Sequence, residues 1–181
     1  MNIVDGLNKE QLEAVEHIEG PCLVLAGAGS GKTKVLTTRI ANMINKGIYS
    51  GNILAITFTN KAAKEMRDRI NNVVDDNYAF VGTFHSFGLK VIRENYNLID
   101  TEIDKFLNSP PEQVAVKVYR EYEIVLRRNN AVDFDDLLKL PVELFVNHED
   151  VLDRYQERFQ YILIDEYQDT NEVQYKLVKK L

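Results

Sequence analysis

A glycine-rich stretch from Ala26 to Thr33, AGAGSGKT, carries the residue types that bind a triphosphate. Its glycines allow positive φ angles, which turn backbone N–H groups inward to cradle an anion. Lys32 would place a point charge on the terminal phosphates, and Thr33 would offer a hydroxyl to Mg²⁺. The stretch matches the pattern G-x-x-x-x-G-K-[ST] except at its first position, where Ala26 replaces glycine. It predicts a nucleoside triphosphate site.

Two acids, Asp165 and Glu166, follow the apolar segment 161–164. The first could hold Mg²⁺, directly or through water, as the ion bridges β- and γ-phosphate oxygens. The second could orient and deprotonate a water for in-line attack. A kinase would need an acceptor pocket instead, and the sequence shows no sign of one. An Asp-Glu pair alone is a weak signal, but together with a phosphate loop it favours hydrolysis.

The elements that would hold these residues alternate between strands and helices. Strands are expected from four apolar segments, at residues 22–25, 53–57, 79–83 and 161–164. A helical pattern follows each of them in turn. Another helix is expected to begin at Asn8, where Gln11 would complete a capping box. Alternation of this kind predicts an α/β fold with a mainly parallel sheet.

Aromatic and polar side chains stand where two of these strands end, which is where ligands bind in open α/β sheets. Phe58, after the second strand, is either a core residue or a platform for a base. The third strand is followed by residues 84–88, FHSFG, which resemble a loop that stacks on bases and contacts phosphates. His85 alone would mean little, because a lone histidine is more often structural.

Residues 89–150 carry no strand signal and are expected to form a helical insertion. A capping box at residues 109–112 would open one of its helices. That helix has an apolar stripe at helical spacing, made of Val114, Val118, Tyr122 and Val125. The acids at residues 133–136 suit a helix N-terminus without any function, so we interpret them as caps and not as metal ligands.

The composition is that of an ordinary globular protein, and its net charge of −6 argues against a general nucleic-acid binder. Residues 32–70 nevertheless hold eight Lys or Arg and two Asp or Glu, which is either a face for phosphates or a solvated charged surface. Cys22 is the only cysteine, which excludes an internal disulfide. Neither a membrane-length apolar run nor a signal peptide is found, so we expect a cytoplasmic protein with no membrane partner.

Six segments resemble, in order, the motifs of superfamily 1A DNA helicases of the UvrD/Rep/PcrA family. LNKEQLEAV is similar to the Q motif, AGAGSGKT to motif I and ITFTNKAAKEMRDRI to motif Ia. VGTFHSFG is similar to motif Ib, DFDDLL to motif Ic and YILIDEYQDTN to motif II. Six ordered motifs over nearly the whole chain are far more specific than a phosphate loop alone. The alanine at position 26 is itself typical of this family.

The resemblance implies a RecA-like P-loop NTPase domain that binds ATP and Mg²⁺. Residues 1–88 and 133–181 would form this domain, and residues 89–132 a reduced helical insertion. Gln11 would contact the adenine, and Arg39 would pack on its ring. The phosphate-binding residues would be Ala26, Gly27, Ala28, Gly29, Ser30, Gly31, Lys32 and Thr33.

The resemblance also implies the roles of the residues around the γ-phosphate. Thr33 and Asp165 would hold Mg²⁺, and Glu166 would act as the general base. Lys32 would stabilise the phosphates, and Gln168 would sense the γ-phosphate and couple it to movement. The single-stranded DNA track would include Phe58, Thr83, Phe84, His85, Ser86 and Phe134.

Two departures from the family pattern qualify these expectations. Motifs beyond motif II are missing, so we expect an N-terminal piece without the second RecA-like domain, unable to unwind DNA or to turn over ATP efficiently. The insertion is shorter than usual, with residues missing near Asn97 to Asp104. The parent would be an ATP-dependent 3′-to-5′ DNA translocase and helicase of repair or replication restart. Alternatives are the motor of an AddA- or RecB-type helicase–nuclease, a nucleotide-switch adaptor, and a P-loop protein whose aromatic residues are merely core.

Overall fold

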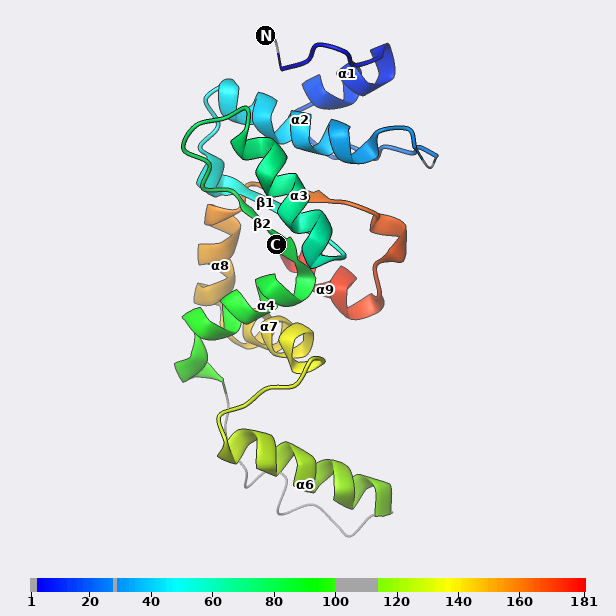
Figure 1. Cartoon of the computed structure of the whole chain (residues 1–181). Helices are drawn as coiled ribbons and strands as arrows, with labels where there is room; N and C mark the ends of the chain where they lie inside the picture. The colour runs from blue at the N-terminus through cyan, green and yellow to red at the C-terminus, as the bar shows by residue number, and fades with distance from the viewer. Residues whose placement is uncertain (1–2, 28, 100–113) are drawn as a thin grey trace. The chain divides into compact units, whose positions relative to one another are not determined.

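The structure, a computed structural model, describes residues 3–27, 29–99 and 114–181 of the chain. It divides into two compact units (Figure 1). The first comprises Met1–Phe84, Asp153–Asn171 and Leu181, and the second comprises His85–Leu152 and Glu172–Lys180. We describe each unit by itself. The predicted capping box at residues 109–112 lies outside the described residues.

The first unit is built on a parallel sheet in the order β2-β1-β3. The strands are β1 (Ile53–Thr57), β2 (Phe80–Thr83) and β3 (Tyr161–Ile164). Every residue of β1 is buried, as expected for a central strand of a parallel sheet that reads as one apolar run. Ala55 aligns with Val81 on one side and with Leu163 on the other, so an apolar row crosses the sheet.

The helices of the first unit are α1 (Lys9–Glu16), α2 (Lys32–Asn45) and α3 (Asn60–Asn71), with short 3₁₀ turns η1 (Ser50–Asn52) and η3 (Tyr167–Asp169). Helices α2 and α3 bury apolar residues against this sheet, whereas α1 packs its apolar residues against α2. Ile40 and Met43 of α2 join Met66 and Ile70 of α3 in one buried cluster with Ala55. Mixed helices and strands with a small parallel sheet confirm the predicted fold class.

The predicted first strand at residues 22–25 is wrong in this structure. The segment has no strand conformation, and Leu23 and Leu25 are 71% and 86% exposed. Its apolar composition suits a strand, but a strand also requires a hydrogen-bonded neighbour. None of the three described strands pairs with it. The missing pairing is the physical reason that the prediction failed.

The second unit is helical over its described residues, in agreement with the absence of a strand signal. Its helices are α4 (Phe84–Glu94), η2 (Tyr96–Leu98), α6 (Val114–Arg128), α7 (Asp136–Asn147), part of α8 (Glu149–Arg158) and α9 (Glu172–Lys180). Helix α4 begins at the residue after β2 ends, so residues 84–88, expected to be a loop, are helical. Phe87 is fully buried, and this burial favours the helix.

A close crossing of α4 and α7 depends on one glycine. A Cβ atom at Gly88 would overlap the carbonyl oxygen of Leu137 on α7. Pro141 lies four residues after Leu137 inside α7 and has no N–H with which to bond that carbonyl. The carbonyl is therefore left without its usual helical donor at the point where α4 approaches. Helix α7 also packs against α9.

The apolar stripe of α6 lies on an exposed face. Val118, Tyr122 and Val125 are 65%, 45% and 52% exposed, whereas Ile124 is buried. Periodicity identified a stripe but could not tell which face of the helix would be covered. Among the described residues, no helix is both long and apolar enough to span a membrane.

Candidate functional site

The phosphate loop is a turn held by its own backbone and closed by glycines. The Ser30 N–H and hydroxyl both donate to the carbonyl of Gly27, at 3.3 and 2.7 Å. Gly29 and Gly31 have φ angles of +75° and +84°, which only glycine adopts at little cost. Gly31 is the N-cap of α2, so the free N–H groups and positive dipole of that helix face the loop. Ala28 lies outside the described residues.

Lys32 and Glu166 connect the phosphate loop to the acids after β3. The Lys32 Nζ lies 3.4 Å from the carbonyl oxygen of Ala26 and 3.6 Å from Oε1 of Glu166. Both side chains are partly exposed, so the ion pair is accessible to a ligand. The lysine expected to bind the phosphates and the carboxylate expected to act on the attacking water therefore lie next to each other.

The acids themselves occupy different environments. The backbone N–H of Asp165 donates to the carbonyl of Ile56 at 2.9 Å and so continues the hydrogen-bond ladder of the sheet. Burial, and to a smaller extent the charge of Glu166, raises the pKa of the Asp165 carboxyl. Glu166 has left-handed backbone angles (φ 50°, ψ 45°), which re-aim its side chain away from the strand path. Gln168 Nε2 donates to Glu166 Oε2 at 2.5 Å; this bond, with the charge of Lys32, lowers the pKa of Glu166. Glu166 is thus held as a carboxylate.

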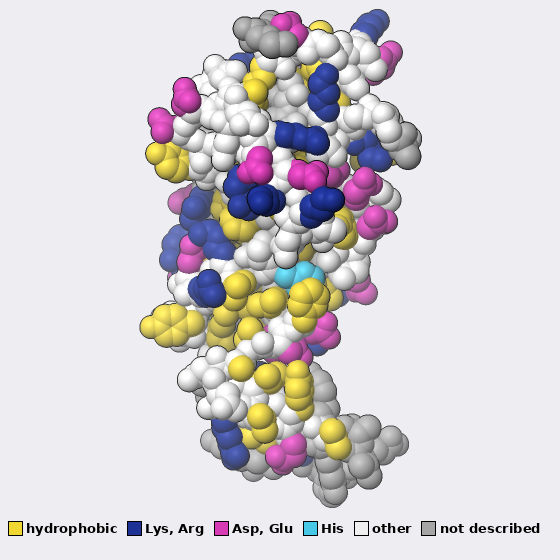
Figure 2. Space-filling model, in the orientation of Figure 1, with side chains coloured by type: hydrophobic (Ala, Val, Ile, Leu, Met, Phe, Trp, Pro, Cys, Tyr) yellow, Lys and Arg dark blue, Asp and Glu magenta, His cyan; other side chains and the backbone are white. Residues whose placement is uncertain are grey.

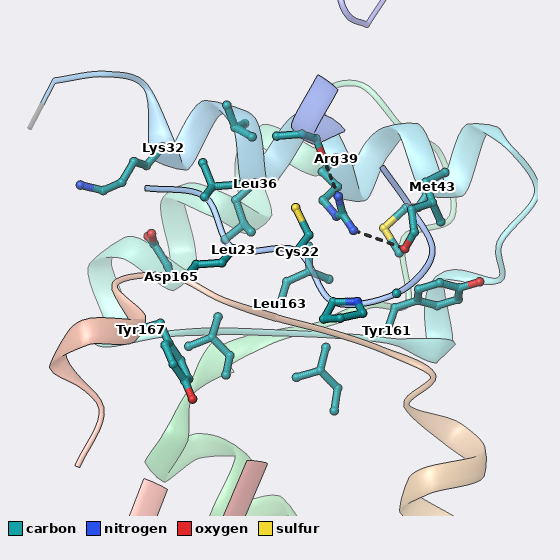
Figure 3. A pocket seen from close by; sticks show the side chains of 18 of the residues that line it. Cys22, Leu23, Lys32, Leu36, Arg39, Met43, Tyr161, Leu163, Asp165 and Tyr167 are labelled. Atoms are coloured by element: carbon teal, nitrogen blue, oxygen red, sulfur yellow. Dashed lines mark hydrogen bonds between the residues drawn. The ribbon is translucent and has the colours of Figure 1, made fainter. Parts of the chain in front are cut away.

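Helix α1 is attached to α2 by side chains that bond its carbonyl groups. Arg39 donates from Nη1 to Ala14 at 2.5 Å and from Nη2 to Ile18 at 3.3 Å (Figure 3, dashed lines). Asn42 donates to Val15 at 3.2 Å. The bonds to Ala14 and Val15 satisfy carbonyls in the last turn of α1 that have no helical partner, and the bond to Ile18 holds the segment that follows the helix. The guanidinium expected to pack on adenine therefore also holds α1 in place.

A cavity of about 730 Å³ runs between α2, the segment 20–25 and residues 160–168. Figure 3 shows Lys32 and Asp165 at one end of it, and Arg39 and Tyr161 at the other. The cavity thus joins the charged end expected for phosphates to the end expected for a base. Its length and its polar termini suit a nucleotide, with apolar walls in between.

The predicted DNA-track residues of the first unit are mostly packed into it. Phe84 is 1% exposed and meets the half-buried Phe58 edge-on, with ring centroids 5.7 Å apart. Thr83 is buried as well. In this structure Phe84 acts as a core residue and offers no ring face to a base, because both of its sides are covered.

In the second unit, His85 and Phe134 form a stacked pair. Their ring centroids are 3.6 Å apart and their planes are inclined by 20°. Phe134 is 66% exposed, and Ser86 on the same helix as His85 is partly exposed. Burial lowers the pKa of His85, while the nearby charge of Asp135 raises it by less. The pair therefore presents a neutral aromatic platform.

The acids at residues 133–136 bond one another's backbone. Asp133 N–H donates to Asp136 Oδ2 at 3.1 Å, and Asp136 N–H donates to Asp133 Oδ1 at 2.8 Å. Among the described residues no group of three or more His, Cys, Asp or Glu could hold a metal ion. The reciprocal bonds between Asp133 and Asp136 agree with the interpretation of these acids as caps, although Asp135 at the N-cap position makes no side-chain cap bond.

Comparison with known proteins places the chain in a family. Residues 7–109 and 101–181 match the model of the UvrD/REP helicase N-terminal domain. The chain belongs to this family. The chain is 38% identical to the ATP-dependent DNA helicase PcrA of Leuconostoc citreum over 234 positions, which cover 99% of the chain and 31% of that protein. It is 40% identical to DNA helicase II of Rickettsia typhi over 235 positions, which cover 99% of the chain and 36% of that protein.

The chain therefore spans about a third of the length of the curated relatives it matches. The alignments run over 234 and 235 positions although the chain has 181 residues, so these UvrD/REP relatives carry residues that this chain lacks. The two family-model matches overlap at residues 101–109.

Basic side chains of this UvrD/REP chain do not form one uninterrupted patch on the face that Figure 2 shows, where Lys and Arg are interspersed with Asp and Glu. On α3, Lys61, Lys64 and Arg69 are exposed, while Arg67 donates to the carbonyl of Val81 at 2.8 Å. The basic segment thus serves partly to attach α3 to β2.

Three contacts of the site were not anticipated from the sequence. They are the bond from Gln11 to the phosphate loop, the bonds from Arg39 to α1, and the ion pair of Lys32 with Glu166. Each joins residues far apart in the chain, so no local pattern could have indicated it.

Proposed function

We propose that this chain is the ATP-binding and ATP-hydrolysing motor part of a 3′-to-5′ DNA helicase or translocase that acts on single-stranded DNA. The observation that carries the proposal is the approach of Lys32 Nζ to Glu166 Oε1 at 3.6 Å, beside the phosphate loop. A lysine for phosphates and a carboxylate for water are thus within reach of one γ-phosphate. Membership of the UvrD/REP family supports the assignment to DNA motors.

The chain's own residues would divide the work of hydrolysis. Backbone N–H groups at the start of α2 and the Lys32 ammonium would bind the phosphate oxygens. On triphosphate binding, Lys32 would exchange Glu166 for phosphate, and Glu166 would then accept a proton from the attacking water. Gln168, bonded to Glu166 at 2.5 Å, would hold the carboxylate in the required orientation.

Thr33 and Asp165 would hold Mg²⁺, which supplies charge neutralisation between the β- and γ-phosphates. A hydroxyl and a carboxylate fit the preference of Mg²⁺ for oxygen ligands, with phosphates and water completing the shell. The raised pKa of Asp165, caused by burial and by the charge of Glu166, also fits, because a cation there would relieve the repulsion.

The proposal extends to partners and to the division of the chain. The other wall of the ATP cleft would come from a second RecA-like domain of the parent protein, and the location would be the cytoplasm. Residues 1–88 and 133–181 would form the motor domain, and residues 89–132 a reduced insertion. The overlap of the family matches at residues 101–109 supports an insertion shorter than in relatives.

The test is the ATPase rate of the full-length protein with and without single-stranded DNA. We expect strong stimulation by DNA and its loss in Lys32→Ala. Lys46→Ala, at the far end of the same helix, is the matched control and should keep the stimulated rate. An ATPase rate that does not depend on DNA would favour a nucleotide-switch adaptor and would contradict the proposed motor function. The absence of ATP turnover would also contradict the proposed motor function.

A further inference from the structure

A side-chain bond links α1 to the phosphate loop across nineteen positions of sequence. Gln11 Nε2 donates to the carbonyl oxygen of Ser30 at 2.9 Å. The same nitrogen lies 3.1 Å from where a Cβ would stand on Gly31, the next residue. The amide of Gln11 therefore rests on the peptide group that joins Ser30 to Gly31.

Gln11 is fixed in this position from its other end. Its Oε1 accepts the backbone N–H of Asn8 at 3.0 Å, and its own N–H donates to Asn8 Oδ1 at 2.8 Å. This capping box determines which way the amide points. Helix α1 is in turn attached to α2 through Arg39 and Asn42. The Gln11 amide that bonds to Ser30 therefore belongs to a helix that is itself held by hydrogen bonds to α2.

The orientation of one peptide group follows from this contact. The C=O and N–H of a trans peptide point in opposite directions. A Ser30 carbonyl held towards α1 therefore directs the Gly31 N–H away from α1. The left-handed conformation of Gly31 leaves this peptide free to rotate unless a contact fixes it, since glycine tolerates many backbone angles.

We propose that Gln11 is a positioning residue for the phosphate loop, which holds the Ser30–Gly31 peptide with its N–H preset for a phosphate oxygen. This inference rests on the proposed function as an ATP site, and it assigns Gln11 a role that does not depend on adenine. The amide keeps one N–H and one acceptor site unused by these bonds. Base recognition and loop geometry would then be coupled through one side chain, and the coupling would be reciprocal.

The experiment compares a ligand with a base and a ligand without one. Binding of Mg–ATP and of Mg–tripolyphosphate to the protein is measured by titration calorimetry for wild type and for Gln11→Met. Methionine keeps the length of the side chain but removes both the donor and the acceptor. We expect Gln11→Met to weaken tripolyphosphate binding about fivefold, the effect of one hydrogen bond, and to weaken ATP binding at least as much.

Glu13→Gln is the matched control, because it changes an exposed side chain of the same helix and leaves the capping box and the bond from Gln11 to Ser30 in place. It should leave tripolyphosphate binding within about twofold of wild type, as expected for an exposed substitution that touches none of the site residues. Thermal melting without ligand checks that both variants are folded, and Gln11→Ala replaces Gln11→Met if the latter is not.

Each other outcome overturns the inference. An effect of Gln11→Met on ATP alone would restrict Gln11 to base recognition. An equal effect of Glu13→Gln would attribute the loss to a general change in α1. A wild-type protein that binds ATP but not tripolyphosphate would show that the loop is not preset. A wild-type protein that binds neither would refute the proposed function itself, which separates that failure from the others.

Discussion

The charged cluster around Lys32 and the aromatic pair of His85 and Phe134 are held together by different forces. Lys32, Glu166 and Gln168 are joined by an ion pair and a short hydrogen bond, with two of the side chains partly exposed. The aromatic rings are joined by stacking at 3.6 Å. The first arrangement is electrostatic, and its geometry can change when a charged ligand arrives. The second depends on packing and on the closeness of the rings.

This difference teaches how each region can be tested by mutation. Exposed ion pairs contribute little to folding, so a change there should alter chemistry without altering stability. Aromatic contacts contribute to folding and to binding at once, because burial and stacking use the same surface. Variants of the aromatic residues therefore need a separate measurement of stability.

The largest expected effect is on the charged cluster, from Glu166→Gln. Loss of a general base should lower the DNA-stimulated kcat by about 10²- to 10⁴-fold. Binding of Mg–ATP should be retained, because the amide can still accept the bond from Gln168 and Lys32 is freed for phosphate. Single-turnover ATPase assays and nucleotide titration measure the two quantities. The matched control is Glu157→Gln, on an exposed position of α8, which should turn over ATP at the wild-type rate.

A comparable loss in Glu157→Gln, or unfolding of Glu166→Gln at the growth temperature, would contradict the separation of chemistry from stability. Either result would mean that the acids after β3 hold the fold together, and the contrast between the two regions would disappear.

A smaller effect should distinguish the exposed ring from the packed one. Phe134→Ala should weaken binding of single-stranded DNA roughly tenfold, the scale of one base stacked on an aromatic ring, with little change in melting temperature because Phe134 is 66% exposed. Phe58→Ala should lower the melting temperature clearly, because Phe58 packs edge-on against the buried Phe84. Fluorescence anisotropy with an oligonucleotide, paired with calorimetric melting, measures both.

Nucleotide binding serves as the internal control for these variants and should not change in either. If Phe134→Ala binds the oligonucleotide as well as wild type does, the stacked pair is a structural feature and not part of a DNA track.

The sequence predicted the local structure around the phosphate loop and the acids after β3 better than the local structure around His85. Gly31 and Lys32 were expected at the start of a helix, and Asp165 at the end of a strand, because phosphate chemistry requires those residue types at those places. The structure places all three there. Their meeting could be foreseen because one ligand must touch them all.

Local patterns failed where the outcome depended on a distant neighbour. Residues 22–25 have the composition of a strand, but no described strand pairs with them. Residues 84–88 were expected to be a loop, although burial of Phe87 makes them helical. Val118 and Val125 lie on an apolar stripe, but periodicity cannot specify which face of the helix is covered by other residues. In each case the deciding interaction comes from another part of the chain.

The smallest expected effect concerns protonation of His85. Burial holds its pKa below the ordinary value of 6.5, so the unfolded chain binds more protons than the folded chain as the pH falls. The stability contributed by the neutral ring is therefore present above pH 6.5 and is lost as the pH falls through the lower, folded pKa.

Melting temperatures measured between pH 7 and pH 5 should show this loss of stability. His85→Phe should reduce the loss, since phenylalanine can stack on Phe134 but cannot titrate. In Asp135→Asn the loss should be larger and should extend to lower pH, because the charge that raises the folded-state pKa of His85 is gone. An unchanged pH dependence of the melting temperature in His85→Phe would assign the loss of stability to other titrating groups. Protonation of His85 would then have no effect on the stability of the aromatic pair.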